Sequence, residues 1–172
     1  MSVPSIESRL REARERLQRA ADALGPKLRG GEIEAWRDAM QGVLGLEREL
    51  AAEKGEEHAV PLDFPVRWVI GAPLPHLLCD DTKIRLIFYV AEGFSGESGA
   101  RIEIVDPRSK APVLLALVEF QAAAASRLGD PNDEVFHGHP LAGRGQEPYC
   151  AQEVLNSKWA AEIQAVNSVH AR

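Results

Sequence analysis

The stretch IRLIFYV at residues 84–90 decides the fold class, because apolar side chains recur there at every second position. Side chains two residues apart point to the same side of an extended chain, so Ile84, Leu86 and Phe88 would share one face of a strand. The residues directly before it, Asp80 to Lys83, are of the kinds that form turns. We therefore predict a strand that follows a hairpin turn.

Further strands are expected on both sides of this one. Residues 66–70 alternate in the same way, residues 77–79 and 113–120 are apolar runs, and residues 101–105 and 149–155 complete the set. The connections between them are too short for the crossovers that parallel strands need. The expectation is a mostly antiparallel sheet of five or six strands.

The ends of the chain change to helical spacing. Residues 5–24 and 32–53 carry apolar side chains at steps of three and four, and Gly25-Pro26 separates the two segments. Two amphipathic helices joined by a short loop predict an antiparallel hairpin. A third helix is expected after Ser157, with an apolar stripe that would pack on the sheet.

These elements together predict an α+β fold. An N-terminal helical hairpin would occupy residues 1–55, and an α+β domain would occupy residues 56–172, with a polar loop at 129–147. A chain of 172 residues is long enough to bury a core, so we expect the two parts to form one compact unit.

Composition narrows the classes of partner. The formal net charge is −6, which disfavours binding to a nucleic-acid backbone because that requires a clustered basic face. No stretch approaches the roughly 18 apolar residues of a membrane span, and the first residues lack a signal-peptide core. We expect a cytoplasmic protein that binds neither nucleic acid nor a membrane.

The polar loop holds the candidate site. His137 and His139 are two residues apart, and on a strand both imidazoles would point to the same side. Asp133 or Glu134 could supply a third ligand, and imidazole with carboxylate suits a divalent metal that activates water or a substrate oxygen. The metal hypothesis therefore names His137, His139 and Asp133.

The same residues allow a metal-free site. His137 or His139 would act as general base, oriented by Asp133 or Glu134, while Arg144 would bind an anionic group of the substrate. A purely structural interpretation is also open, because the residues from Asp130 onward form turns readily.

Cysteines and the remaining histidines are expected to be structural. Cys79 and Cys150 are predicted to be buried free thiols, with Cys150 as a nucleophile activated by a loop histidine as the alternative. His58 and His76 lie in proline-flanked connectors and are predicted to be at the surface.

Two functions follow from these patterns. The first is a small ligand-binding or catalytic domain that uses loop 130–150 on a small molecule, with or without a divalent metal. The alternative is an acidic protein-interaction module of the inhibitor or immunity type with no catalytic activity. Association of copies through the helical hairpin is a further expectation.

Overall fold

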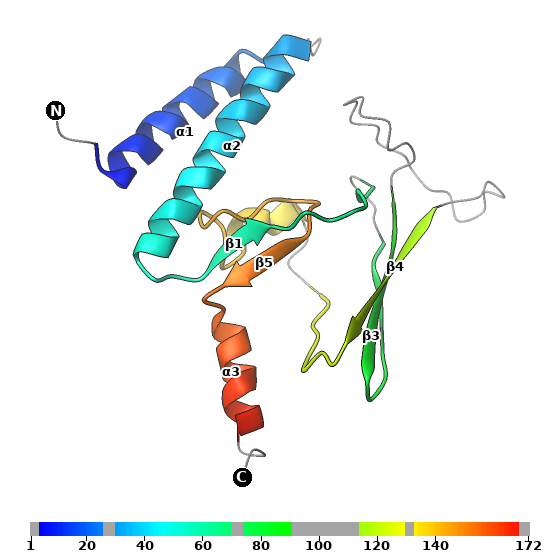
Figure 1. Cartoon of the computed structure of the whole chain (residues 1–172). Helices are drawn as coiled ribbons and strands as arrows, with labels where there is room; N and C mark the ends of the chain where they lie inside the picture. Colours follow the sequence, from blue (N-terminus) through cyan, green and yellow to red (C-terminus); the bar gives the residue numbers. More distant parts are fainter. Residues whose placement is uncertain (1–3, 26–29, 70–73, 91–113, 130–132, 169–172) are drawn as a thin grey trace. The chain divides into compact units, whose positions relative to one another are not determined.

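A computed structural model of the chain describes residues 4–25, 30–69, 74–90, 114–129 and 133–168 (Figure 1). The chain divides into two compact units. The first, called here the hairpin unit, comprises Met1–Pro61, Asp133–Glu147 and Gln152–Arg172. The second, the sheet unit, comprises Leu62–Asn132 and Pro148–Ala151.

Two helices, α1 (Ile6–Asp22) and α2 (Gly30–Glu53), lie side by side in the hairpin unit (Figure 1). Their contact buries Leu10, Ala13 and Val43, the apolar positions that helical spacing places on one face. Ion pairs join Glu7 to Lys54 and Arg9 to Glu49, so the helices run antiparallel. The predicted hairpin is thus confirmed for its helices, while its connecting residues 26–29 lie outside the described part.

The start of α1 follows from its sequence. The Ser5 hydroxyl accepts a hydrogen bond from the Ser8 backbone N–H at 3.3 Å, which satisfies one of the free donors of the first turn. Glu7 in that turn has its pKa lowered, first by a hydrogen bond from the backbone.

A short antiparallel ladder, β1 (His58–Pro61) with β5 (Gln152–Leu155), completes the strands of this unit. The ladder is held to α2 by Arg48. Its Nε donates to the Ala59 carbonyl at 3.0 Å, and its Nη2 donates to the Gly145 carbonyl at 2.8 Å. One guanidinium therefore joins helix α2, strand β1 and the segment around Gly145.

Glu47 precedes Arg48 on α2, and its buried carboxylate contacts both α1 and Gly145. Its Oε1 accepts from the Arg14 guanidinium of α1 at 2.9 Å, and its Oε2 lies 3.4 Å from the Gly145 backbone nitrogen. A buried carboxylate is costly without such partners. Glu47 and Arg48 together thus fix residues 144 and 145 against the hairpin.

The sheet unit contains β2 (His76–Cys79), β3 (Lys83–Tyr89) and β4 (Leu115–Gln121), antiparallel in the order β2-β3-β4. One face forms the core of the unit, where Ile84 and Phe88 are buried. The Trp68 ring packs on Phe88 with ring centroids 4.7 Å apart. The hairpin turn and strand predicted from residues 80–90 are confirmed.

The expected single sheet of five or six strands is wrong. The described residues form one two-stranded and one three-stranded sheet. Of the predicted strand at 66–70, the described residues 66–69 contribute only the isolated bridge between Trp68 and Val90, because proline and glycine residues bracket this stretch. The predicted strand at 101–105 lies outside the described residues.

The third helix, α3 (Lys158–Asn167), begins at the expected cap, where the Ser157 hydroxyl accepts from the Ala160 N–H at 3.2 Å. The predicted packing of α3 on a sheet is not found within the described part of the hairpin unit. Among the described residues of the hairpin unit it packs on neither β1 nor β5, and Trp159 and Val166 are exposed. Asn156, in the left-handed region at φ 53°, turns the chain between β5 and α3 (Figure 1). No helix of the described residues is long and apolar enough to cross a membrane.

The contact of Arg48 with Gly145 predicts unequal effects of two glycine substitutions. Both Gly143 (φ 74°) and Gly145 (φ 79°) are left-handed, which costs an alanine about 1 kcal/mol. A Cβ at Gly145 would also collide with Arg48 Cγ and lie 3.0 Å from the Ala59 carbonyl oxygen, whereas at Gly143 it meets nothing within 4 Å. We expect Gly145→Ala to lower the free energy of unfolding by roughly 2–3 kcal/mol and Gly143→Ala by only about 1 kcal/mol.

Urea denaturation measures this difference when it is followed by circular dichroism in the helix band, since α1 and α2 both belong to the hairpin unit. Equal losses in the two variants would contradict the role given to Arg48.

Candidate functional site

The predicted site lies on a 3₁₀ helix, η1 (Asp133–Gly138), and the turns that follow it. Backbone N–H groups of His139, Ala142 and Arg144 each donate to the carbonyl three residues earlier, at 2.9 to 3.1 Å. His137 and His139 are therefore not on a strand. Gly138 and Pro140 explain this, because neither residue suits the middle of a paired strand.

His139 is half-buried, and its ring is already used. Its Nδ1 accepts a hydrogen bond from the Leu141 backbone N–H at 3.1 Å. The neutral ring then carries its proton on Nε2, whereas a metal-binding histidine usually donates from the nitrogen opposite the metal. In this arrangement His139 serves the turn and has no free lone pair for a metal or for a substrate proton.

The other proposed ligands give no support for a metal cluster. His137 is exposed at the end of η1. Asp133 and Glu134 belong to the same 3₁₀ helix, but their side chains lie outside what the structure describes. Among the side chains that are described, no three His, Cys, Asp or Glu groups come together in a way that could hold a metal ion.

Arg144 is occupied by neighbours in the fold. Its Nε lies 3.5 Å from Oε2 of Glu56, and its carbonyl accepts the Ala59 N–H at 3.0 Å. An anionic ligand would have to compete with the Glu56 carboxylate for the guanidinium.

Two predictions about single residues are corrected. His58 is buried, with 5% of its surface exposed, and its Nδ1 lies 2.9 Å from the Glu56 carbonyl oxygen. Cys79 is exposed rather than core, because it ends an edge strand, and its Sγ lies 3.3 Å from the Ser126 hydroxyl. Cys79 and Cys150 are not joined in a disulfide and His76 is exposed, as predicted, whereas Cys150 is only partly buried.

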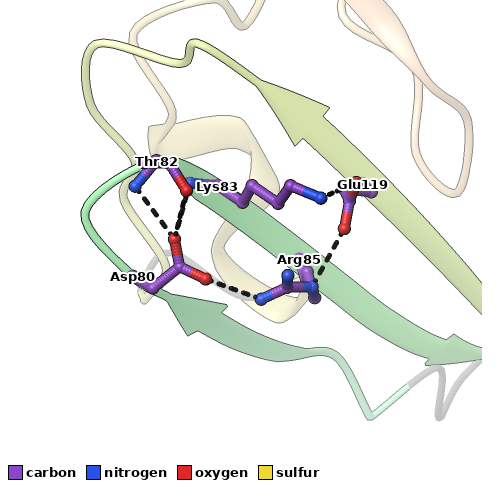
Figure 2. A network of polar contacts seen from close by, with 5 residues as sticks. All are labelled: Asp80, Thr82, Lys83, Arg85 and Glu119. Atoms are coloured by element: carbon purple, nitrogen blue, oxygen red, sulfur yellow. Dashed lines mark hydrogen bonds and ion pairs between the residues drawn. The ribbon is translucent and has the colours of Figure 1, made fainter.

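A charged network on the sheet unit had no counterpart in the sequence-based predictions (Figure 2). Asp80 accepts hydrogen bonds from the backbone N–H groups of Thr82 and Lys83, both at 2.9 Å, and from Arg85 at 2.9 Å. Arg85 and Lys83 in turn bind the two oxygens of Glu119 on β4, at 3.1 and 2.8 Å. The network ties the turn to the neighbouring strand.

The electrostatics of the network follow from these contacts. The Thr82 backbone N–H, together with Arg85, holds the pKa of Asp80 far below its usual range. The hydrogen bond from Lys83 lowers the pKa of Glu119, and that of Arg85 is raised chiefly by Asp80. Asp80, Glu119 and Arg85 therefore remain ionised and paired at neutral pH.

An apolar surface adjoins this network on the same face of the sheet. We call it the outer face, and it is formed by side chains opposite the buried Ile84 and Phe88: Leu78, Ile87, Tyr89, Leu115 and Leu117. Leu117 stands opposite Ile87 and Leu115 opposite Tyr89, so four of these side chains form one contiguous block.

The three leucines of the outer face are 54%, 57% and 63% exposed, in the order Leu78, Leu115 and Leu117. By contrast, none of the exposed large apolar side chains of the described residues lies on α1 or α2. Among the described residues, the exposed large apolar side chains therefore gather on the sheet rather than on the hairpin through which association of copies was expected. The sequence signal was only the apolar run at 113–120, which does not tell which of its side chains are exposed.

Comparisons of this chain with known protein families, with curated proteins and with solved structures find no match.

The geometry of His139 predicts the behaviour of the two histidines. Metal analysis of protein purified without chelator should give the same low zinc, iron and manganese content for the wild type and for His137→Ala/His139→Ala. His139→Ala alone should lower the free energy of unfolding by about 1 kcal/mol, because the Leu141 N–H loses its acceptor. His137→Ala, at an exposed position, should change it by less than about 0.5 kcal/mol. Near-stoichiometric metal in the wild type that is absent from the double variant would restore the metal site.

The depressed pKa of Asp80 predicts a pH-dependent contribution to stability. Its folded pKa lies below the unfolded value of about 4, so the stabilisation is complete above that value and is lost as the pH falls further. Asp80→Asn should thus destabilise the sheet unit at pH 7, and the difference from the wild type should shrink between pH 4 and pH 3.

Hydrogen exchange of the β2 and β3 amides measures this difference. Asp81→Asn is the matched control, since Asp81 has no hydrogen bond or ion pair among the described residues. A pH-independent effect of Asp80→Asn, or an equal effect of Asp81→Asn, would contradict the assignment.

Proposed function

We propose that this protein is a protein-interaction module and that the outer face of the three-stranded sheet binds another polypeptide. The observation that carries the proposal is the exposure of Leu78, Leu115 and Leu117 on one face of the sheet. The sequence suggested a protein-interaction module as the alternative function, and the proposal assigns its binding surface to the sheet unit instead of the hairpin.

The energetics of the outer face support binding. Fully burying a leucine contributes about 1.5–3 kcal/mol relative to leaving it exposed. A partner that covers three half-exposed leucines would therefore gain several kcal/mol of binding free energy. Contiguous exposed apolar patches on soluble proteins usually mark sites of interaction. The block of Ile87, Tyr89, Leu115 and Leu117 is a patch of this kind.

The charges beside the block suit the edge of an interface. Lys83, Arg85, Asp80 and Glu119 are joined by ion pairs of 2.8 to 3.1 Å, and the four formal charges cancel. Interfaces commonly combine an apolar centre with a polar rim of this type. Because the charges already have partners, covering the leucines would leave no charge of the network uncompensated.

The catalytic hypothesis for loop 130–150 has less support. His139 and Arg144 would have to leave Leu141 and Glu56 before either could act on a ligand. The groups of this loop with described partners stabilise its turns and hold it to α2 and β1.

Site-specific photo-cross-linking tests the proposal. A Leu115→p-benzoylphenylalanine variant is irradiated in buffer and in an extract of the native host, and adducts are identified by mass spectrometry. We expect discrete polypeptide adducts whose yield drops about tenfold on adding Leu117→Ser, equivalent to about 1.4 kcal/mol of lost contact.

The matched control is Leu128→Ser, because Leu128 is similarly exposed in the same unit but is not on the sheet. Adducts that are unchanged by Leu117→Ser, or no adduct under either condition, would refute the proposed function.

A further inference from the structure

We propose that β4 pairs antiparallel with β4 of a second copy of this chain across a two-fold axis, which makes one continuous sheet of six strands. The inference rests on the proposed function and names a second copy as the polypeptide, bound along the β4 edge of the outer face. It follows from the orientation of the β4 backbone, the lack of protection along its edge and the order of its side chains.

The first observation is that β4 is an edge strand among the described residues, with β3 on its inner side. The Val90 N–H donates to the Leu114 carbonyl at 3.1 Å, so the Leu114 carbonyl points toward the β3 side. Hydrogen-bonding direction alternates along an antiparallel strand. The backbone groups of Leu115, Leu117 and Glu119 therefore point outward and are available to another strand.

The second observation is that, within the part of the chain that the structure describes, this edge lacks the usual protection. Natural edge strands are blunted by lysine, proline, bulges or short length. β4 is seven residues long, has no proline or lysine, and pairs with β3 without a bulge. The opposite edge, β2, is only four residues long and directly follows Pro75. β4 is thus the edge suited to pairing.

The charges of the β4 edge allow a second copy as the occupant. A chain with a formal net charge of −6 repels its own copies unless they meet on a neutral surface. The only charged side chain of β4 is Glu119, which is bound by Lys83 and Arg85 of its own sheet. The β4 edge therefore brings no uncompensated charge to a contact between identical chains.

The order of side chains selects one register. With Ala116 on the two-fold axis, Leu115 faces Leu117 of the second copy and Leu114 faces Val118, so all pairs within residues 114–118 are apolar. Moving the axis to Leu117 places Leu115 opposite Glu119, and moving it to Val118 places Leu117 opposite Glu119. Apolar cross-strand pairs stabilise a sheet, whereas an unmatched carboxylate does not. In the Ala116 register, Leu114, Leu115 and Leu117 of each copy lie opposite apolar residues of the other copy. All three leucines are more than half exposed in the single chain.

The expected affinity is modest. Pairing of one strand edge buries less than the roughly 1,200 Å² of a standard stable interface. Sedimentation should therefore show a mass that rises from 18.8 kDa toward twice that value as the concentration of the full chain increases from about 1 to about 200 μM. Leu117→Lys should keep the chain monomeric over this range, and Leu128→Lys, off the sheet, should behave as the wild type.

Cysteine cross-linking tests the register. In the Ala116 register, the two Ala116 residues form a non-hydrogen-bonded pair with Cα atoms about 4.5 Å apart, within the range that a disulfide spans. In a Cys79→Ser/Cys150→Ser background, Ala116→Cys should give a disulfide-linked dimer with copper phenanthroline as oxidant. Val118→Cys is the control on the same face of β4, and it should not cross-link because Val118 faces Leu114 of the second copy.

The remaining outcomes separate this inference from the proposed function. A monomer at every concentration, or a cross-link through Val118→Cys with none through Ala116→Cys, would refute it. Photo-adducts to a foreign polypeptide alone would leave the proposed function standing and exclude a second copy as partner. Adducts of this chain with itself that disappear with Leu117→Ser would support both.

Discussion

The guanidinium of Arg48 is the interaction on which the hairpin unit depends. It binds the carbonyls of Ala59 and Gly145, residues that are far from each other in the sequence, and so connects α2 with β1 and with the segment after η1. A guanidinium suits this position because its planar array of donors can satisfy two carbonyls at once. Glu47 adds a second tie, from α1 through Arg14 to the Gly145 backbone.

This arrangement explains why the polar segment does not need a ligand to account for its residues. Charged and polar groups inside a protein are costly unless they are paired. Arg48 contacts Glu147 at 3.5 Å, Arg144 contacts Glu56 at 3.5 Å, and His139 accepts from Leu141. The described contacts of imidazole, carboxylate and guanidinium near residues 137–147 attach a turn to a helix, a use that local sequence does not distinguish from a catalytic site.

Local sequence patterns predicted individual helices and strands, whereas the errors concern which strands pair with each other. Helical spacing located α1 and α2, and alternation with a preceding turn located β3. β1 was missed because it is four residues long and ends in proline, and its partner β5 is about ninety residues away, which no local period reveals. The burial of His58 and the exposure of Cys79 also depend on strand pairing. His58 lies in the ladder held by α2, and Cys79 ends an edge strand.

The sheet unit shows why exposure, rather than composition, points to function here. Residues 115–118 belong to an apolar run whose sequence does not indicate exposure, yet Leu115 and Leu117 are exposed beside β3. On the same face Arg85 and Glu119 are paired with each other. An apolar block costs little solubility when the charges around it cancel locally and the rest of the chain is strongly acidic. A contact there needs no charge on the partner. The net charge of −6 disfavours contact between copies, so the acidic composition is compatible with self-association only where the charges cancel locally.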